Sequence, residues 1–391
     1  MPIITAPRLL VDGRFAGPGA VVVDGGVMAE VLPSRPSPGA GHVELRDGLL
    51  TAGMVDLQVN GAYGVDLVAA STAQWELVAR RLASTGVTAF LPTFITAAVQ
   101  DLIGALVRTA TARAALNGTA AARILGAHLE GPFLSPVQAG AHDQALMLDP
   151  TPARLDALLA GEEDRDVLRL VTLAPERPHA LDAIRRLTAA GVVVSVGHSD
   201  ATGAQTAAAA DAGARLVTHL FNAQRGLGHR EPGVAGHALS DERYTLGLIA
   251  DLEHVDPEIV HVVFRAAGAR VALVTDSIAA AGMPLGRYEL GGTEVIVEPG
   301  ERLPRRADGT IAGSVLRLDE AVRNVVEVGI EPELALLAAT RVPADALGRT
   351  DLGRIAPGAR ADLVWWDDDL VPRRVWIGGV EVPSDGLPGF A

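Results

Sequence analysis

A strand followed by a helix recurs through the middle of the chain, and this alternation restricts the possible folds more than any other feature. Glycines at 86, 191, 213 and 268 follow Ala-rich helical segments, where a helix C-cap favours a left-handed residue. Eight such units in about 250 residues are typical of the α/β class and predict a closed, parallel (β/α)8 barrel of the TIM type. The expected strands are residues 54–59, 88–94, 124–130, 168–173, 192–198, 216–220, 245–250 and 271–276.

The two ends of the chain have a different pattern from the middle. Short alternating runs broken by Gly, Pro and Ser clusters predict antiparallel strands in residues 1–50 and 348–391. We expect these ends to form one small β-sandwich domain beside a barrel of residues 51–347, although two separate β appendages would give the same pattern. A Gly- and Pro-rich stretch at 284–306 predicts a hairpin inserted before the last helix. An open doubly wound sheet is the alternative to the barrel, but no G-x-G-x-x-G motif follows a strand.

Composition excludes several classes of function. The 391 residues include no cysteine and no lysine, which excludes thiolate metal ligands, a P-loop and a bridging carbamylated lysine. A formal net charge of −14 disfavours nucleic acid or an anionic membrane as a partner. The chain lacks an uninterrupted apolar run long enough for a membrane span, and its N-terminus lacks a signal-peptide pattern. We therefore expect a cytoplasmic protein that acts on a small molecule.

Polar side chains lie at the carboxyl ends of the predicted strands, where barrel enzymes build their active sites. They are Gln58 and Asn60 on the first strand, Glu130 on the third, His198 on the fifth, His219 and Asn222 near the end of the sixth, and Asp276 on the eighth. Strand periodicity would place His198 on the same face as Val194 and Val196. A carboxylate and two imidazoles with an open position are a known arrangement of zinc ligands. Each histidine alone is more often a core or surface residue, and Asp276 alone could cap a turn, but the combination favours a metal site.

Motifs that occur in order along the chain carry a resemblance to a known family. They are HLEGP at 128–132, GHS at 197–199, HLFNA at 219–223, REPG at 230–233, IAD at 249–251, HVD at 254–256, VTD at 274–276 and IAGS at 311–314. These motifs resemble those of the N-acetylglucosamine-6-phosphate deacetylases, in the amidohydrolase superfamily, and the likeness runs from about residue 7 to residue 379. The resemblance implies a zinc or similar divalent ion held by Glu130, His198 and His219, with Asp276 as general base and acid.

The resemblance also implies the contacts with the substrate. Arg230 and the backbone at Asn222 and Ala223 would hold the sugar phosphate, with Arg230 reaching into the pocket of a neighbouring subunit in a homodimer. The remaining implied contacts are Ala141, His142, His254, Ile311, Ala312 and Gly313.

The first strand departs from the superfamily, in which most members place His-x-His where this chain has Gln58 and Asn60. Amides are poor zinc ligands compared with imidazoles, so we expect this second-metal position to be vacant and one metal ion to bind per chain. The implied reaction is hydrolysis of the acetamide of N-acetyl-D-glucosamine 6-phosphate to D-glucosamine 6-phosphate and acetate, in amino-sugar catabolism. The alternatives are another amide hydrolase or deaminase of the superfamily, and a catalytically silent sugar-phosphate-binding barrel.

Overall fold

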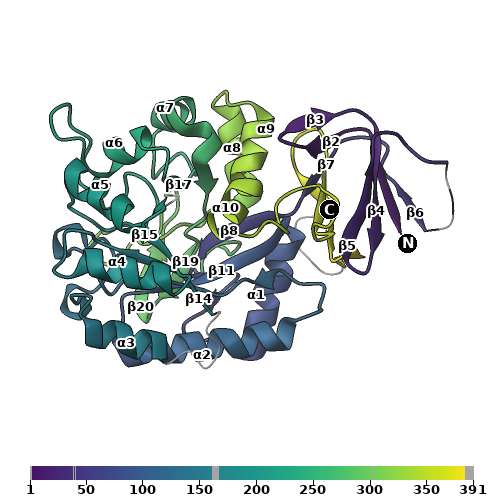
Figure 1. The fold of residues 1–391 in the computed structure, drawn as a ribbon. Coiled ribbons are helices and arrows are strands. Elements are labelled where there is room, and N and C mark those ends of the chain that lie inside the picture. The colour runs from purple at the N-terminus through teal and green to yellow at the C-terminus, as the bar shows by residue number, and fades with distance from the viewer. Residues whose placement is uncertain (1, 38, 40, 161–166, 302, 384–391) are drawn as a thin grey trace.

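The computed structural model describes residues 2–37, 39, 41–160, 167–301 and 303–383. Its centre is a parallel barrel, which confirms the predicted (β/α)8 fold (Figure 1). The barrel strands are β8 (Met54–Val59), β11 (Val87–Ile95), β12 with β13 (Arg123–Ile124 and Ala127–Glu130), β14 (Leu168–Leu173), β15 (Val193–Val196), β16 (Leu216–Val217), β17 (Thr245–Leu248) and β18 (Val271–Leu273). The last strand returns to the first through backbone bonds from Asp276 N to Gln58 O (3.0 Å) and from Asn60 N to Ser277 O (2.9 Å).

Helices cover the outside of the barrel, and their local sequences explain where they begin. Ser71 and Gln74 form a capping box at the start of α1, while Asp256 caps α7 with Pro257 in its first turn. Their apolar faces join the same buried core as the strands. The helices are α1 (Thr72–Ser84), α2 (Val99–Leu116), α3 (Pro152–Ala160), α4 (Ala180–Ala189), α5 (Gly203–Ala212), α6 (Gly233–Ser240), α7 (Pro257–Ala267), α8 (Leu318–Glu327), α9 (Pro332–Ala339) and α10 (Arg341–Ala346).

Two sheets at one end of the molecule confirm the small β-sandwich built from both chain ends (Figure 1). One sheet has the order β5-β4-β1-β6 and the other the order β23-β22-β21-β7-β2-β3. Ile4 and Val21 from the first sheet share a buried core with Leu50, Leu363 and Trp376 from the second. The strands are β1 (Ile3–Ala6), β2 (Leu9–Val11), β3 (Arg14–Ala16), β4 (Gly19–Asp24), β5 (Val27–Leu32), β6 (His42–Glu44), β7 (Leu49–Ala52), β21 (Leu363–Trp366), β22 (Pro372–Ile377) and β23 (Val380–Glu381). The domain limits, 1–50 with 348–391 and 51–347, remain a proposal.

The predicted hairpin insertion is present as β19 (Gly286–Leu290) paired with β20 (Thr293–Val297), and a second short pair is formed by β9 (Gly61–Ala62) and β10 (Val65–Asp66). Three helices, α8 to α10, follow the hairpin instead of the single one expected. The capping prediction was wrong for Gly268, which is right-handed (φ −50°) because the chain continues there into a short 3-10 turn.

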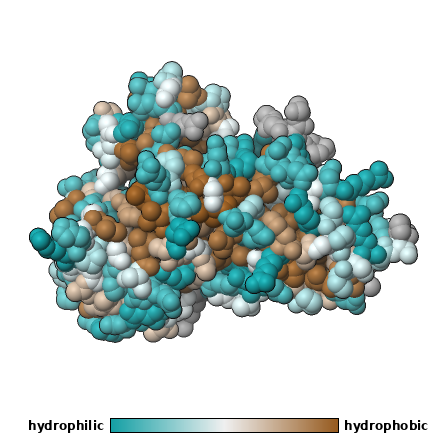
Figure 2. All heavy atoms as spheres, turned by 90° about the horizontal axis from the view of Figure 1, so that it is seen from above, coloured by the Kyte–Doolittle hydropathy of each residue, from teal (hydrophilic) through white to brown (hydrophobic). Residues whose placement is uncertain are grey.

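The outer surface is mixed in character. Figure 2 views the molecule from above Figure 1 and shows hydrophobic residues gathered across the middle of this face, with hydrophilic residues toward its edges. None of the helices in the described ranges combines the length and the apolar character that crossing a membrane requires.

Candidate active site

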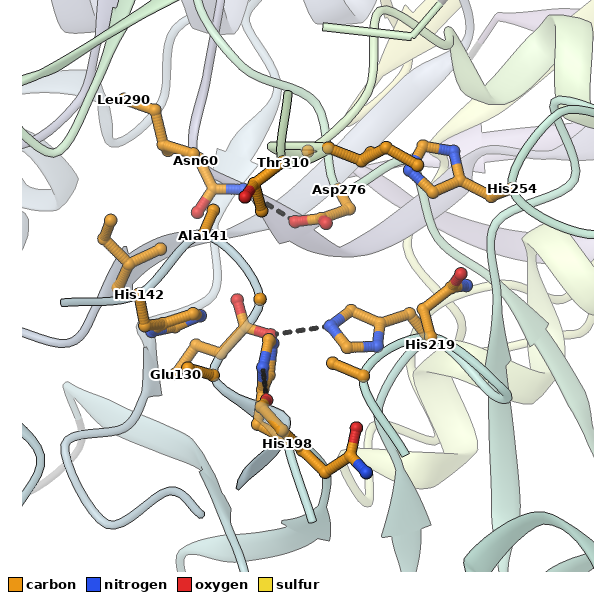
Figure 3. Close-up of a pocket in the computed structure, with 18 of the residues that line it drawn as sticks. Asn60, Glu130, Ala141, His142, His198, His219, His254, Asp276, Leu290 and Thr310 are labelled. Carbon is orange, nitrogen blue, oxygen red and sulfur yellow. Dashed lines mark hydrogen bonds and ion pairs between the residues drawn. The ribbon is translucent and has the colours of Figure 1, made fainter. Parts of the chain in front are cut away.

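The predicted metal ligands Glu130, His198 and His219 converge at the carboxyl ends of the barrel strands (Figure 3). Oε1 of Glu130 lies 2.9 Å from Nε2 of His219 and 3.2 Å from Nε2 of His198. All three side chains are buried. Burial by itself would raise the pKa of Glu130, but the hydrogen bonds with the two imidazoles lower that pKa well below its ordinary value. Glu130 is therefore an anion that lies between two imidazole nitrogens.

The strands end earlier than their sequences predicted, and this changes how the site residues are placed. β15 ends at Val196, β16 at Val217 and β18 at Leu273. His198, His219 and Asp276 follow these ends with left-handed backbones, at φ angles of +46°, +27° and +50°. The prediction that strand alternation carries on to His198 was therefore wrong, because the chain turns out of the strand before that residue. Such conformations are unfavourable for non-glycine residues and concentrate at functional sites.

The loop after β13 fixes the orientation of His198. Nδ1 of His198 donates to the backbone carbonyl of Gln138 at 2.9 Å, since a carbonyl can only accept. The backbone N–H of Ser135 donates to the carbonyl of His198 at 2.9 Å. A Cβ on Gly140 would lie 3.0 Å from Cε1 of the imidazole, so this close approach requires glycine. In a neutral His198 the lone pair is therefore on Nε2, which faces Glu130.

His142 is a second candidate for the third ligand position. Glu130, His142 and His198 offer ligand atoms that all lie within 4.8 Å of one another. However, Nδ1 of His142 accepts a hydrogen bond from the backbone N–H of Thr96 at 3.2 Å. Burial and the neighbouring His198 lower the pKa of His142 to about 3, so the ring is neutral and its Nε2 carries the proton. His142 is therefore a hydrogen-bond donor at this site.

Asp276 faces the metal ligands from the far side of the barrel end (Figure 3). Its Oδ1 accepts hydrogen bonds from Nε2 of Gln58 (2.9 Å) and from Nδ2 of Asn60 (2.8 Å). Gln58 also donates to Oε2 of Glu130 at 3.1 Å. Burial raises the pKa of Asp276 to about 6, and the negative charge of Glu130 acts in the same direction. A carboxylate with such a pKa can accept and return a proton near neutral pH.

A cavity of about 430 Å³ opens over these groups. The predicted substrate contacts that line it are Ala141, His142, Asn222, Ala223, His254, Ile311 and Gly313. Nδ1 of His254 is 2.6 Å from Oδ2 of Asp251, so this carboxylate orients the imidazole at the cavity wall. Ala312 is fully buried and is not one of the lining residues. The hairpin and the segment after it close one side of the cavity through Leu290 and Thr310.

Arg230 and Arg305 differ in their positions relative to the cavity. Arg230 is exposed and lies outside the lining of this cavity. Arg305, which sequence reasoning missed, is the one arginine among the described lining residues. Its Nε donates to Glu301 at 3.0 Å and its Nη1 to the Gly309 carbonyl at 2.9 Å, which leaves other N–H groups for a ligand. Its place near the end of the Gly- and Pro-rich stretch at 284–306, where the hairpin was predicted, was the available signal.

The donor set fits a divalent metal ion. Two imidazole nitrogens face one carboxylate oxygen, and the Nε2 lone pair of a neutral His198 would repel Oε1 of Glu130 unless a cation or a proton lies between them. Nδ1 of His219 has no hydrogen-bond partner within the described residues. No hydrogen bond on that side of the ring therefore turns Nε2 away from Glu130. Carboxylate and imidazole donors suit zinc and several other divalent metals.

Comparisons with known proteins agree with this chemistry. A model of the amidohydrolase family matches residues 49–382. The chain is 40% identical over 380 residues to the N-acetylgalactosamine-6-phosphate deacetylase of Escherichia coli O157:H7, covering 96% of this chain and 98% of that protein. It is 37% identical over 332 residues to the N-acetylglucosamine-6-phosphate deacetylase of Vibrio furnissii, covering 84% of this chain and 82% of that protein.

A solved structure agrees over the whole length. It is the N-acetyl-D-glucosamine-6-phosphate deacetylase of Mycobacterium smegmatis, an Asp-to-Ala variant in complex with N-acetyl-D-glucosamine-6-phosphate. That structure superposes with a TM-score of 0.90 at 36% identity, covering 97% of this chain and 99% of the other.

Proposed function

Because the chain belongs to the amidohydrolase family, among the deacetylases of N-acetyl amino-sugar 6-phosphates, we propose that it hydrolyses the acetamide of N-acetyl-D-glucosamine 6-phosphate. The products are D-glucosamine 6-phosphate and acetate, which places the enzyme in amino-sugar catabolism. The observation that carries the proposal is the pairing, in one cavity, of Asp276 with the cluster of Glu130, His198 and His219.

A divalent metal ion would be held by Glu130, His198 and His219, with one ion per chain. A divalent cation there supplies Lewis-acid chemistry, because it makes water a stronger acid and withdraws electron density from a carbonyl oxygen. We propose zinc, since one carboxylate and two imidazoles are a common zinc donor set. His142 is assigned no ligand role, because its Nδ1 accepts from Thr96 and its Nε2 therefore carries a proton.

Asp276 moves the proton during the reaction. Its carboxylate accepts a proton from the attacking water and then donates that proton to the amide nitrogen, so that the amine can leave. The Nε2–H of His142 is a donor for the acetyl carbonyl oxygen, where negative charge develops as the water attacks. Both residues are buried, so water competes little for these hydrogen bonds.

The sugar phosphate occupies the rest of the cavity. The backbone at Asn222 and Ala223 and the imidazole of His254 line it and contact the sugar phosphate, as does the segment Ile311–Gly313. We propose a homodimer in which the exposed Arg230 enters the neighbouring pocket, and a cytoplasmic setting, where a charged sugar phosphate is retained because ions cross apolar membranes poorly.

N-acetyl-D-galactosamine 6-phosphate is a second candidate substrate, because the Escherichia coli O157:H7 relative, which is 40% identical, is a deacetylase of that sugar phosphate. The test is acetate release from four compounds: both N-acetylhexosamine 6-phosphates and their two unphosphorylated sugars. We expect kcat/KM to be highest for one of the phosphates. Absence of acetate release from both phosphates by metal-loaded enzyme would refute the proposed function.

A further inference from the structure

We infer that Gln58 and Asn60 are positioning residues, whose amide groups hold Asp276 so that one of its two carboxylate oxygens remains free to carry the proton. This inference rests on the proposed function, since it assigns a task within that reaction. Both side chains are buried, at 2% and 3% relative exposure; Gln58 is on β8, the first barrel strand, and Asn60 directly follows it. Figure 3 shows the Asn60 amide directed at the Asp276 carboxylate from the rim of the cavity.

The hydrogen bonds distinguish the two oxygens of Asp276. Oδ1 accepts from Gln58 at 2.9 Å and from Asn60 at 2.8 Å, which occupies both of its lone pairs. Oδ2 receives no hydrogen bond from any described residue. The carboxylate therefore presents Oδ2 as the oxygen that accepts the proton.

The backbone explains why the side chain needs these contacts. Asp276 lies three residues beyond the end of β18 with a left-handed backbone, and its N–H donates to the carbonyl of Gln58 at 3.0 Å. Ser314 N in turn donates to the carbonyl of Asp276 at 2.9 Å. These bonds fix the main chain but leave rotation about the side-chain bonds. The two amides restrict that rotation from the neighbouring strand.

Electrostatics explains why amides suit this position. Glu130 and Asp276 are both buried carboxyl groups, and the negative charge of Glu130 opposes ionisation of Asp276. Gln58 donates to both, at 3.1 Å and 2.9 Å, and places the positive end of its dipole between them. Neutral donors thus offset this repulsion without adding a second cation. Gln58 and Asn60, which replace the His-x-His pair, therefore assist proton transfer in addition to leaving the second metal position vacant.

Asn60 is the residue to change, because among the described residues its side chain bonds Asp276 and none of the proposed metal ligands. Asn60→Ala removes the donor, and the nearly isosteric Asn60→Leu removes it without leaving a hole. Each variant loses a hydrogen bond to a charged group, so kcat should fall by about 10- to 100-fold in both. KM should stay within threefold, because Asp276 acts on the transition state. The metal content should remain one ion per chain.

Thr51→Val is the matched control for loss of a buried hydrogen bond. It removes the acceptor of Trp366 Nε1, at 2.8 Å, in the β-sandwich, and neither residue lines the cavity. Its melting temperature should fall while its kcat per bound metal stays at the wild-type value.

The inference is overturned if the Asn60 variants keep kcat within twofold of wild type, or if only KM changes in them. If wild-type enzyme releases no acetate from either sugar phosphate, the proposed function itself has failed.

Discussion

Replacing Asp276 by asparagine tests the assigned mechanism at a single oxygen. Asparagine can keep its carbonyl oxygen at the position of Oδ1, where Gln58 and Asn60 donate at 2.9 and 2.8 Å. Its NH2 group then occupies the position of Oδ2, which accepts no hydrogen bond from a described residue. The variant therefore keeps the shape and the hydrogen bonds of the site but replaces the proton acceptor by a donor.

The expected loss follows from the role of that oxygen. General acid–base catalysis contributes about 10²–10⁴-fold, which corresponds to roughly 3–5.5 kcal/mol of transition-state stabilisation. Metal should remain bound, because Glu130, His198 and His219 are unchanged. Substrate binding should change little, because the acid acts after binding.

The assay is acetate release at saturating sugar phosphate, with metal content and melting temperature measured on the same preparation. Turnover within threefold of wild type would refute the mechanism. A marked loss of metal would instead identify Asp276 as a metal ligand. A stability loss of about 1 kcal/mol with normal turnover would identify it as a turn cap, since asparagine caps almost as well as aspartate.

Four further substitutions test three separate features: the metal site, the phosphate contacts and a buried carboxyl group. His198→Ala should lose metal and turnover together while far-UV circular dichroism stays that of the wild type, because the residue lies beyond the end of its strand. Arg230→Ala and Arg305→Ala should each lower kcat/KM about 10- to 100-fold for the phosphorylated sugar and much less for the unphosphorylated one, because a charge-assisted contact to phosphate is lost. Asp56→Asn should flatten the pH dependence of unfolding between about pH 4 and pH 7, because burial raises the pKa of Asp56 to about 7.

The sign of the Asp56 effect follows from linkage. A raised pKa in the folded state means that the carboxyl stabilises the fold fully below its unfolded pKa of 3.8, and that this stability is lost as pH rises through about 7. One such group changes the free energy of unfolding by at most about 1.4 kcal/mol per pH unit. Urea unfolding of wild type and variant at several pH values measures the difference, and parallel curves would contradict it.

The arginine variants and the His198 variant have their own controls. Arg287→Ala is the control for the two arginine variants. It removes an exposed arginine of the β19–β20 hairpin, paired with Glu294 at 2.6 Å, and should leave kcat/KM for both sugars unchanged. Equal losses for the two sugars in the Arg230 or Arg305 variant would make that residue structural. Metal retained in His198→Ala would contradict its assignment as a ligand.

The sequence sufficed for the barrel because hydrophobic runs and helix signals repeat eight times with little interruption. It also placed Glu130, His198, His219 and Asp276 at strand ends, where parallel strands bring residues far apart in sequence to one rim. The left-handed backbones of His198, His219 and Asp276 were not predictable, since local propensity disfavours them and the surrounding hydrogen bonds impose them.

Several site features depend on contacts that no motif encodes. The proton on Nε2 of His142 is set by the backbone N–H of Thr96, which belongs to another strand–helix connection. Arg305 enters the cavity wall because its backbone pairs with Ile296 of β20, through bonds of 2.8 and 2.9 Å. Such placements follow from how the hairpin docks on the barrel, which a single sequence does not specify.

Reconstitution of the metal-free enzyme tests the central claim most directly. Enzyme stripped by a chelator is titrated with zinc while bound metal and the rate of acetate release from N-acetyl-D-glucosamine 6-phosphate are followed together. The account predicts no turnover without metal, a linear rise, and a plateau at one ion per chain, because Gln58 and Asn60 replace the ligands of a second site. Full activity in the stripped enzyme, or a plateau reached only at two ions per chain, would contradict it.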